Sequence, residues 1–221
     1  MNKKTDAVLH TKYLVTEGPI GVGKTSLTSL LADELGARLV LERAEENPFL
    51  SDFYKNAERY RFQTQMFFLL SRFSQQQEIF QPDLFTRITI SDYLFDKDRI
   101  FAYLTLDEHE LPLYEQVYKI LEPKIIKPDL VIFLQADTDT LLRRIKQRGR
   151  SFEKEISQDY IAAVNDAYNN FFFRYNDTPL LVINTSDIDF VHRREDLDDL
   201  LKQILNMKQG TQYYVPVSRK R

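Results

Sequence analysis

The chain contains no cysteine among its 221 residues. This absence excludes disulfide bonds, zinc–thiolate centres and a thiol nucleophile, and it fits a cytoplasmic location, which we expect. No apolar run approaches the roughly 18 residues that cross a membrane, so we expect no membrane partner. Residues 1–12 are polar and lack the apolar core of a secretory signal, and we expect them to form a flexible N-terminal segment.

An excess of basic residues is also missing. The 30 Lys and Arg residues are outnumbered by 33 Asp and Glu residues, which gives a net charge of −3. Nucleic-acid binders usually carry a clear basic excess, so we expect no nucleic-acid partner. The composition still leaves room for a small anionic ligand, because a local basic cluster is enough to bind one.

Short apolar runs rich in β-branched residues alternate with longer segments of helical periodicity. This alternation is typical of βαβ units with a parallel sheet, and runs that are apolar throughout indicate burial on both faces. The sequence therefore predicts an α/β three-layer sandwich, a five-stranded parallel sheet between helices, over residues 13–209, with a tail at 210–221. We expect strands at 13–16, 38–41, 88–91, 130–134 and 180–183, and helices at 24–35, 50–77, 107–121, 138–147, 158–175 and 195–207.

A phosphate-binding loop is the strongest local signal. Residues 18–25 read GPIGVGKT and match G-x-x-x-x-G-K-[ST] at every fixed position, between an apolar run and a helical segment. In such a P-loop the backbone N–H groups and the lysine contact phosphates, and the hydroxyl of the last residue binds Mg²⁺. A chance match has odds of roughly 1%. We predict a site for ATP and Mg²⁺, with Lys24 catalytic, formed by Gly18, Gly21, Gly23, Lys24, Thr25 and Ser26.

Two carboxylates directly follow predicted strands, Asp92 and Glu42. Ligands of open parallel sheets bind beyond the carboxyl ends of the strands, so both carboxylates belong at one crevice. Asp92 is predicted to hold Mg²⁺ together with Thr25, and a helix N-cap is the alternative. Glu42 is predicted to accept the proton of an attacking hydroxyl, with Glu45 and Glu46 as alternatives.

The segment 143–150 contains four arginines. Arg144 and Arg148 lie four residues apart and share a helix face, and Arg150 follows Gly149. Taken alone, such a run is more often a solvated helix end. In a chain with a P-loop it predicts an arginine-rich lid over the phosphates, in which Arg144 and Arg148 stabilise the transferring group.

In this order, these features resemble the deoxynucleoside kinase family, and most of all its bacterial deoxyadenosine and deoxyguanosine kinases. The resemblance implies transfer of the γ-phosphoryl group of ATP to the 5′-hydroxyl of a deoxynucleoside, in nucleotide salvage, with a purine favoured. It also implies a homodimer formed through long helices. The likeness spans about residues 13–191 and rests on the P-loop and on ENPFL at 46–50, FQTQMFF at 62–68, SDY at 91–93 and RIKQRGRSFE at 144–153.

The resemblance further implies a role for each matching residue. Glu42 would deprotonate the 5′-hydroxyl, and Tyr54 and Glu153 would hold the 3′-hydroxyl. Gln65 and Arg72 would read the base, and their seven-residue spacing places them on one helix face. The remaining implied contacts are Asp92 near the substrate, Arg144, Arg148 and Arg150 over the phosphates, and Asp189 and Phe190 beside the adenine of ATP.

One position departs from the family pattern. Many members carry an acid, an arginine and a serine after the third strand, whereas this chain has Asp92, Tyr93 and Leu94. Tyr93 cannot supply the positive charge of that arginine, and Lys97 is a candidate substitute. The acid that accompanies the arginine in base recognition is left open.

Three alternatives stay open at this point. The acid in the base site is Asp96 or Asp98. The enzyme could instead be a nucleoside monophosphate kinase of the thymidylate type, with Arg59, Arg61 or Arg72 binding the acceptor phosphate. It could also be a nucleotide-binding module without turnover.

Overall fold

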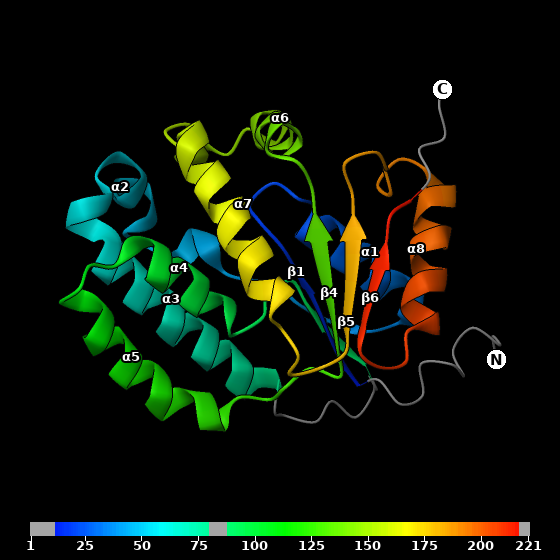
Figure 1. The fold of residues 1–221 in the computed structure, drawn as a ribbon, viewed down its shortest axis with the longest axis horizontal. Helices are drawn as coiled ribbons and strands as arrows, with labels where there is room; N and C mark the ends of the chain where they lie inside the picture. The colour runs from blue at the N-terminus through cyan, green and yellow to red at the C-terminus, as the bar shows by residue number, and fades with distance from the viewer. Residues whose placement is uncertain (1–11, 80–87, 217–221) are drawn as a thin grey trace.

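One parallel sheet forms the centre of the molecule (Figure 1). The computed structural model describes residues 12–79 and 88–216, so the flexible segment expected at 1–12 lies almost wholly outside the described residues. The strand order is β2-β3-β1-β4-β5-β6, with every pair parallel. The strands are β1 (Tyr13–Glu17), β2 (Arg38–Val40), β3 (Thr89–Ser91), β4 (Leu130–Gln135), β5 (Leu180–Asn184) and β6 (Thr211–Tyr214).

The predicted α/β sandwich is confirmed, but the prediction of five strands is wrong. The sixth strand, β6, lies within residues 210–221, which the sequence analysis assigned to a tail. It pairs with β5 from Leu180↔Thr211 to Ile183↔Tyr214, and Gly210 turns the chain into it at φ 70°. Most side chains of β6 are exposed, so the strand carries no apolar run that periodicity would detect.

Helices cover both faces of the sheet and form the two outer layers (Figure 1). The helix predicted at 50–77 is two helices that meet at Asn56, and the helix at 97–105 was not predicted. The α-helices are α1 (Lys24–Leu35), α2 (Leu50–Lys55), α3 (Ala57–Ile79), α4 (Lys97–Thr105), α5 (Glu110–Leu121), α6 (Thr138–Arg148), α7 (Gln158–Phe173) and α8 (Arg194–Asn206).

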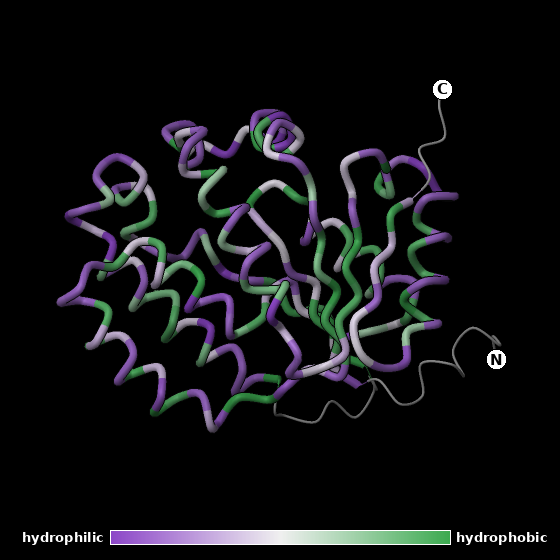
Figure 2. The backbone as a smooth tube through the Cα atoms, viewed as in Figure 1, coloured by the Kyte–Doolittle hydropathy of each residue, from purple (hydrophilic) through white to green (hydrophobic). Residues whose placement is uncertain are grey.

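The two sides of each central strand pack into different cores. In β4, Ile132 joins a core with residues of α1, α6 and α8, whereas its neighbour Phe133 packs with residues of α4 and α7. This alternation follows from the two-residue period of a strand. Figure 2 shows the hydrophobic strands enclosed by helices whose outward residues are hydrophilic. A third core around Leu69, Phe95 and Tyr114 joins α3 to α4 and α5.

The topology brings three chain segments to the carboxyl ends of adjacent strands. The P-loop follows β1, Glu42 follows β2, and Asp92 follows β3. Because β2, β3 and β1 are neighbours in the sheet, these residues meet at one edge. Within residues 12–79 and 88–216, no helix is long and apolar enough to span a membrane.

Removal of β6 should destabilise the protein. A chain that ends at Gly210 loses the backbone hydrogen bonds of the β5–β6 pair and exposes the apolar edge of β5. We expect the Tm to fall by about 5–10 °C and light scattering to rise. A chain that ends at Pro216 keeps β6 and is the control. An unchanged Tm in the shorter chain would show that β6 contributes nothing.

Candidate active site

The P-loop is held in a narrow gap that requires glycine. Gly18 and Gly21 have φ angles of 151° and 85°. A Cβ at Gly18 would lie 2.5 Å from the carbonyl oxygen of Leu134, and one at Gly21 would lie 2.7 Å from Ile145 Cγ1. The loop therefore fits between β4 and α6 only without side chains at these positions. Gly23 is the N-cap of α1, so the N-terminus of this helix points toward the loop. Such an arrangement binds anions.

Lys24 folds back over the P-loop. Its Nζ donates hydrogen bonds to the carbonyl oxygens of Gly18 at 2.6 Å and Pro19 at 3.1 Å. Burial lowers the pKa of Lys24 to about 8, although the nearby Glu17 opposes this shift. A phosphate group bound in the loop would place negative charge beside the Lys24 amine. This charge would stabilise the protonated form of Lys24.

Thr25 and Asp92 lie in direct contact. The Thr25 hydroxyl donates to Asp92 Oδ2 at 2.6 Å, and the backbone N–H of Glu42 donates to Oδ1 at 2.7 Å. Asp92 caps no helix, because α4 begins only at Lys97. Among the described residues, no group of three or more His, Cys, Asp or Glu side chains could hold a metal. A hydroxyl and one carboxylate fit Mg²⁺, which usually takes few protein ligands and completes its shell with water and phosphate oxygens.

Glu42 is held by two cations, Arg72 and Lys97. Its Oε1 accepts hydrogen bonds from Arg72 Nε at 2.8 Å and Nη2 at 2.5 Å, and its Oε2 accepts one from Lys97 Nζ at 2.7 Å. Burial raises the pKa of Glu42, but Arg72 and Lys97 outweigh it and hold the pKa well below its usual range. Glu42 is therefore an ionised hydrogen-bond acceptor throughout the physiological pH range.

Gln65 and Arg72, the two base-reading residues expected on one face of α3, both contact Asp98. Gln65 Nε2 donates to Asp98 O at 2.9 Å and to Asp98 Oδ1, and Arg72 Nη1 donates to Asp98 Oδ2. Tyr114 of α5 also donates to Asp98 Oδ1, at 2.9 Å. Asp96 instead accepts a hydrogen bond from a tyrosine of α5. The acid beside Gln65 and Arg72 is thus Asp98.

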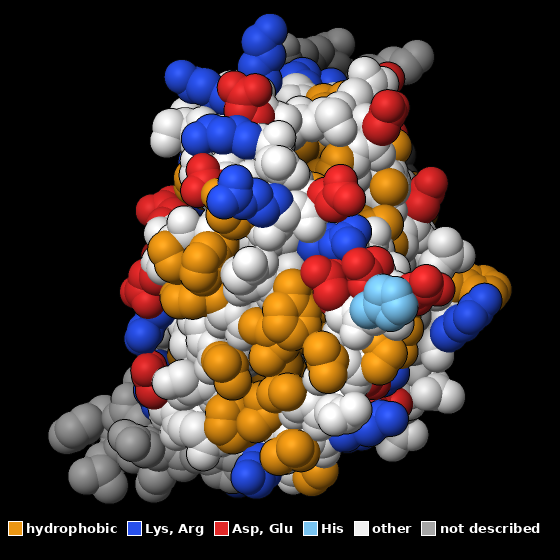
Figure 3. Space-filling model, turned by 90° about the vertical axis from the view of Figure 1, so that its left-hand side faces the viewer, with side chains coloured by type: hydrophobic (Ala, Val, Ile, Leu, Met, Phe, Trp, Pro, Cys, Tyr) orange, Lys and Arg blue, Asp and Glu red, His pale blue; other side chains and the backbone are white. Residues whose placement is uncertain are grey.

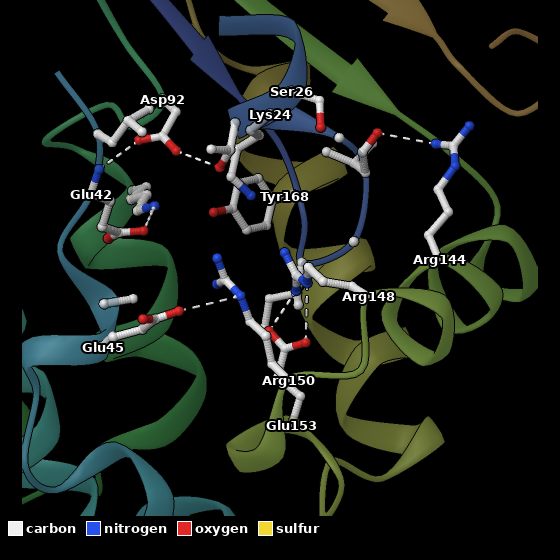
Figure 4. A pocket seen from close by; sticks show the side chains of 18 of the residues that line it. Lys24, Ser26, Glu42, Glu45, Asp92, Arg144, Arg148, Arg150, Glu153 and Tyr168 are labelled. Atoms are coloured by element: carbon white, nitrogen blue, oxygen red, sulfur yellow. Dashed lines mark hydrogen bonds and ion pairs between the residues drawn. The ribbon is translucent and has the colours of Figure 1, made fainter. Parts of the chain in front are cut away.

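The sugar-binding candidates lie under the lid segment. Glu153 is buried and accepts two hydrogen bonds from Arg148, from Nη2 at 2.5 Å and from Nε at 3.2 Å. Burial, then the charges of Glu153 and Glu42, raises the pKa of Tyr54, so its hydroxyl stays protonated. Arg150 points the other way across the cavity, with Nε 3.5 Å from Glu45 Oε1 (Figure 4).

Arg144 does not join the other lid arginines. Its guanidinium donates to the carbonyl oxygens of Val22 at 3.0 Å and Thr185 at 2.7 Å. It therefore connects the P-loop to the segment after β5, away from Arg148 and Arg150 (Figure 4). In that segment, the buried Phe190 ring lies beside Gly23, where an added Cβ would be 3.0 Å from its Cζ.

A single cavity of about 1420 Å³ unites these residues. This volume exceeds the roughly 300–1,000 Å³ of a pocket for one ligand and suits two substrates side by side. Ser26 and Asp189 also line it, at the end that contains the P-loop. Of the predicted site residues, Gly18 alone is not part of the cavity wall.

Several residues of the site were not predicted from the sequence. Glu17 is not part of the cavity wall, but it is fully buried and accepts hydrogen bonds from Gly18 N at 2.9 Å and Tyr168 Oη at 3.1 Å; its position directly before the P-loop was its only signal. The Arg72 guanidinium lies over the Phe68 ring, with its carbon 4.7 Å from the ring centroid. Phe68, Phe101 and Tyr168 all line the cavity. Nothing in the sequence separates these rings from core aromatics.

Known proteins match this chain over nearly its whole length. The family described as Deoxynucleoside kinase matches residues 14–208. A deoxyguanosine kinase of Bacillus subtilis is 35% identical over 199 residues, which cover 87% of this chain and 95% of the relative. A deoxyadenosine kinase of Lactobacillus acidophilus is 33% identical over 207 residues, with coverages of 87% and 94%.

A solved structure agrees with the sequence matches. The deoxyadenosine kinase of M. mycoides with bound dATP superimposes with a TM-score of 0.77 at 25% identity, over 87% of this chain and 98% of that chain. The structural match and the family match indicate the same family as the P-loop, the buried acids and the arginine-rich segment do. The chain belongs to the deoxynucleoside kinase family.

Proposed function

We propose that this kinase transfers the γ-phosphoryl group of ATP to the 5′-hydroxyl of a purine deoxynucleoside, with deoxyadenosine preferred to deoxyguanosine. One observation carries the proposal: a single cavity joins a complete P-loop to an ionised carboxylate, Glu42, which two cations orient. The family membership supports the reaction class, and the cysteine-free composition supports a cytoplasmic location.

The nucleotide end would bind the phosphates of ATP. The backbone N–H groups of the P-loop and Lys24 would contact the β- and γ-phosphates, and Asp189 and Phe190 would lie beside the adenine. Thr25 and Asp92 would hold Mg²⁺ through oxygen atoms, which is the ligand type it prefers. When bound, Mg²⁺ neutralises charge that develops on the phosphates.

The acceptor end would orient the nucleophile. Phosphoryl transfer proceeds through a loose transition state, so positioning of the attacking hydroxyl matters more than a strong base. Glu42, with its low pKa, suits this role, because its carboxylate is always available to accept the hydrogen bond of the 5′-hydroxyl. Closure of the segment with Arg148 and Arg150 would exclude water and prevent hydrolysis of ATP.

The acceptor is better suited to a nucleoside than to a nucleoside monophosphate. Of the three arginines that could bind an acceptor phosphate, Arg61 is paired with Asp107 at 2.5 Å and with Glu110 at 2.7 Å. Arg72 is committed to two acids, and the exposed Arg59 is not part of the cavity wall. An acceptor phosphate would therefore meet the Glu42 carboxylate, which repels it.

The orientation of Gln65 supports a base with an exocyclic amine. Its Nε2 donates both hydrogen bonds to Asp98, so the amide oxygen is the atom left for a ligand. Adenine offers an N6 amine to such an acceptor, whereas guanine has the acceptor O6 at that position. Cytosine shares the amine pattern, so deoxycytidine is the alternative acceptor.

The test of this function is ADP release with Mg·ATP and each deoxynucleoside in turn, compared with the corresponding monophosphates. We expect deoxyadenosine to give the highest kcat/KM, because Gln65 presents an acceptor to its N6 amine, and deoxyguanosine to follow, since one relative is named for that nucleoside. Stimulation by monophosphates alone would replace the proposal with a nucleoside monophosphate kinase. Binding of ATP without stimulation by any acceptor would indicate a nucleotide-binding module.

The role of Gln65 can be tested separately with Gln65→Ala. Loss of the amide oxygen should lower kcat/KM for deoxyadenosine by about 10–100-fold, the discrimination expected of a good polar contact to a base. The KM for ATP should change by less than about twofold, because Gln65 lies at the other end of the cavity. Gln63→Ala, an exposed position on another face of α3, is the matched control. Equal losses for all bases would contradict the assignment.

We also propose a homodimer through the outer face of α3 and α5. Leu70 of α3 and Leu113 and Ile120 of α5 are large hydrophobic side chains that are 50%, 55% and 63% exposed. Hydrophobic side chains gather over this face of the molecule in Figure 3. A contiguous apolar face is typical of an interaction surface, and two copies related by a twofold axis would cover it mutually.

The dimer would be tested with the double variant Leu113→Asp/Ile120→Asp. Burial of two carboxylates in an apolar interface is unfavourable, so we expect sedimentation velocity to show monomers where the unmodified chain shows dimers. Tyr213→Asp, at an exposed position on β6, should leave the dimer intact. Dimers of unchanged stability in the double variant would exclude this face.

A further inference from the structure

Lys97 is a buried amine in the wall of the cavity. It is the first residue of α4 and is 2% exposed. Its Nζ lies 2.7 Å from Glu42 Oε2 and 3.9 Å from Glu17 Oε2. Desolvation of charges often cancels the attraction within a buried ion pair, so such a pair is a weak source of stability. The position of Lys97 therefore calls for a functional explanation.

The segment after β3 places Lys97 at the acceptor end of the cavity. Asp92, at its start, contacts Thr25 beside the P-loop. The chain is then fixed by the hydrogen bond from Leu94 N to Glu17 Oε2 at 2.7 Å, and by the one from Lys97 N to Leu94 O at 3.2 Å. This turn directs the Lys97 side chain toward Glu42. Tyr93, by contrast, is fully buried and is not part of the cavity wall.

The two cations that hold Glu42 have different further partners. Arg72 binds Oε1 and also Asp98, so it belongs to the base site as well. The acidic neighbours of Lys97 are Glu42, at the end of the cavity where phosphoryl transfer would occur, and Glu17, directly before the P-loop. Without Lys97, Oε2 would lose its hydrogen bond, and the Glu42 carboxylate would be free to rotate about the Oε1 contact.

We infer that Lys97 is the positioning residue for Glu42: it fixes the second carboxylate oxygen, so that the carboxylate is oriented toward the acceptor hydroxyl, and it supplies the positive charge that Tyr93 cannot. This inference rests on the proposed function, because Glu42 needs an orientation only if it receives a hydroxyl. It assigns to Lys97 an effect on turnover rather than on the binding of either substrate.

The first test compares Lys97→Met with Lys97→Arg in the full chain. We expect Lys97→Met to lower kcat about 10²-fold, as for a misplaced catalytic group, with KM values for ATP and deoxynucleoside within about threefold. Lys97→Arg, which keeps the charge, should have a kcat at least about tenfold higher than that of Lys97→Met. Lys202→Met, at an exposed position on α8, is the matched control and should keep full activity.

A double-mutant cycle with Glu42→Gln separates positioning from a structural role. If Lys97 acts through Glu42, then Lys97→Met/Glu42→Gln should be no slower than Glu42→Gln alone. Independent, multiplying losses would overturn the inference. Titration of each variant with ATP reports whether it is folded. The inference would also be overturned if Lys97→Met were unfolded and Lys97→Arg were folded but inactive. A positive charge at this position would then not support turnover.

Failure of this inference is distinguishable from failure of the proposed function. If the unmodified chain phosphorylates deoxynucleosides and Lys97→Met does so at the same rate, the function stands and Lys97 is not a positioning residue. If the unmodified chain phosphorylates no deoxynucleoside, the proposed function fails and the role of Lys97 fails with it.

Discussion

The partly buried carboxylate of Glu42 is the constraint on which the site depends. A carboxylate in this position is stable only with partners, and its partners, Arg72 and Lys97, come from α3 and α4. The segment after β2 and these two helices are therefore fixed relative to one another by charge as well as by apolar packing. Asp98 and Tyr114 extend the same network to α5, on the outer side of the molecule.

In the proposed mechanism, one guanidinium would serve both the base site and the acceptor hydroxyl. Arg72 contacts Asp98 beside Gln65 with one nitrogen and Glu42 with two others. A base that displaces Asp98 would therefore also shift Arg72 and, through it, the Glu42 carboxylate. Because positioning dominates this kind of chemistry, a base that fits poorly would reduce turnover and not only binding. Under the proposed function, specificity and catalysis would thus depend on the same side chain.

The parts of the molecule that the sequence predicted are those with a local or periodic signal. The P-loop is a contiguous motif, and Glu42 and Asp92 follow strands whose apolar character is evident. Gln65 and Arg72 share a face because helix periodicity fixes the angle between them. Each of these predictions needed only residues adjacent in the chain or at most about two helical turns apart, so the tertiary fold did not have to be known.

The remaining features depend on partners that are distant in the sequence. Lys97 reaches Glu42 across 55 positions, and Asp98 rather than its neighbour Asp96 meets Arg72 because the first turn of α4 faces α3 that way. Periodicity grouped Arg144 with Arg148 on one helix face but could not show that backbone oxygens would bind Arg144 away from the other lid arginines. A buried ion network is built from such long-range contacts, because each buried charge needs a partner to remain stable. The residues that fix catalytic geometry are therefore the ones that periodicity is least able to identify.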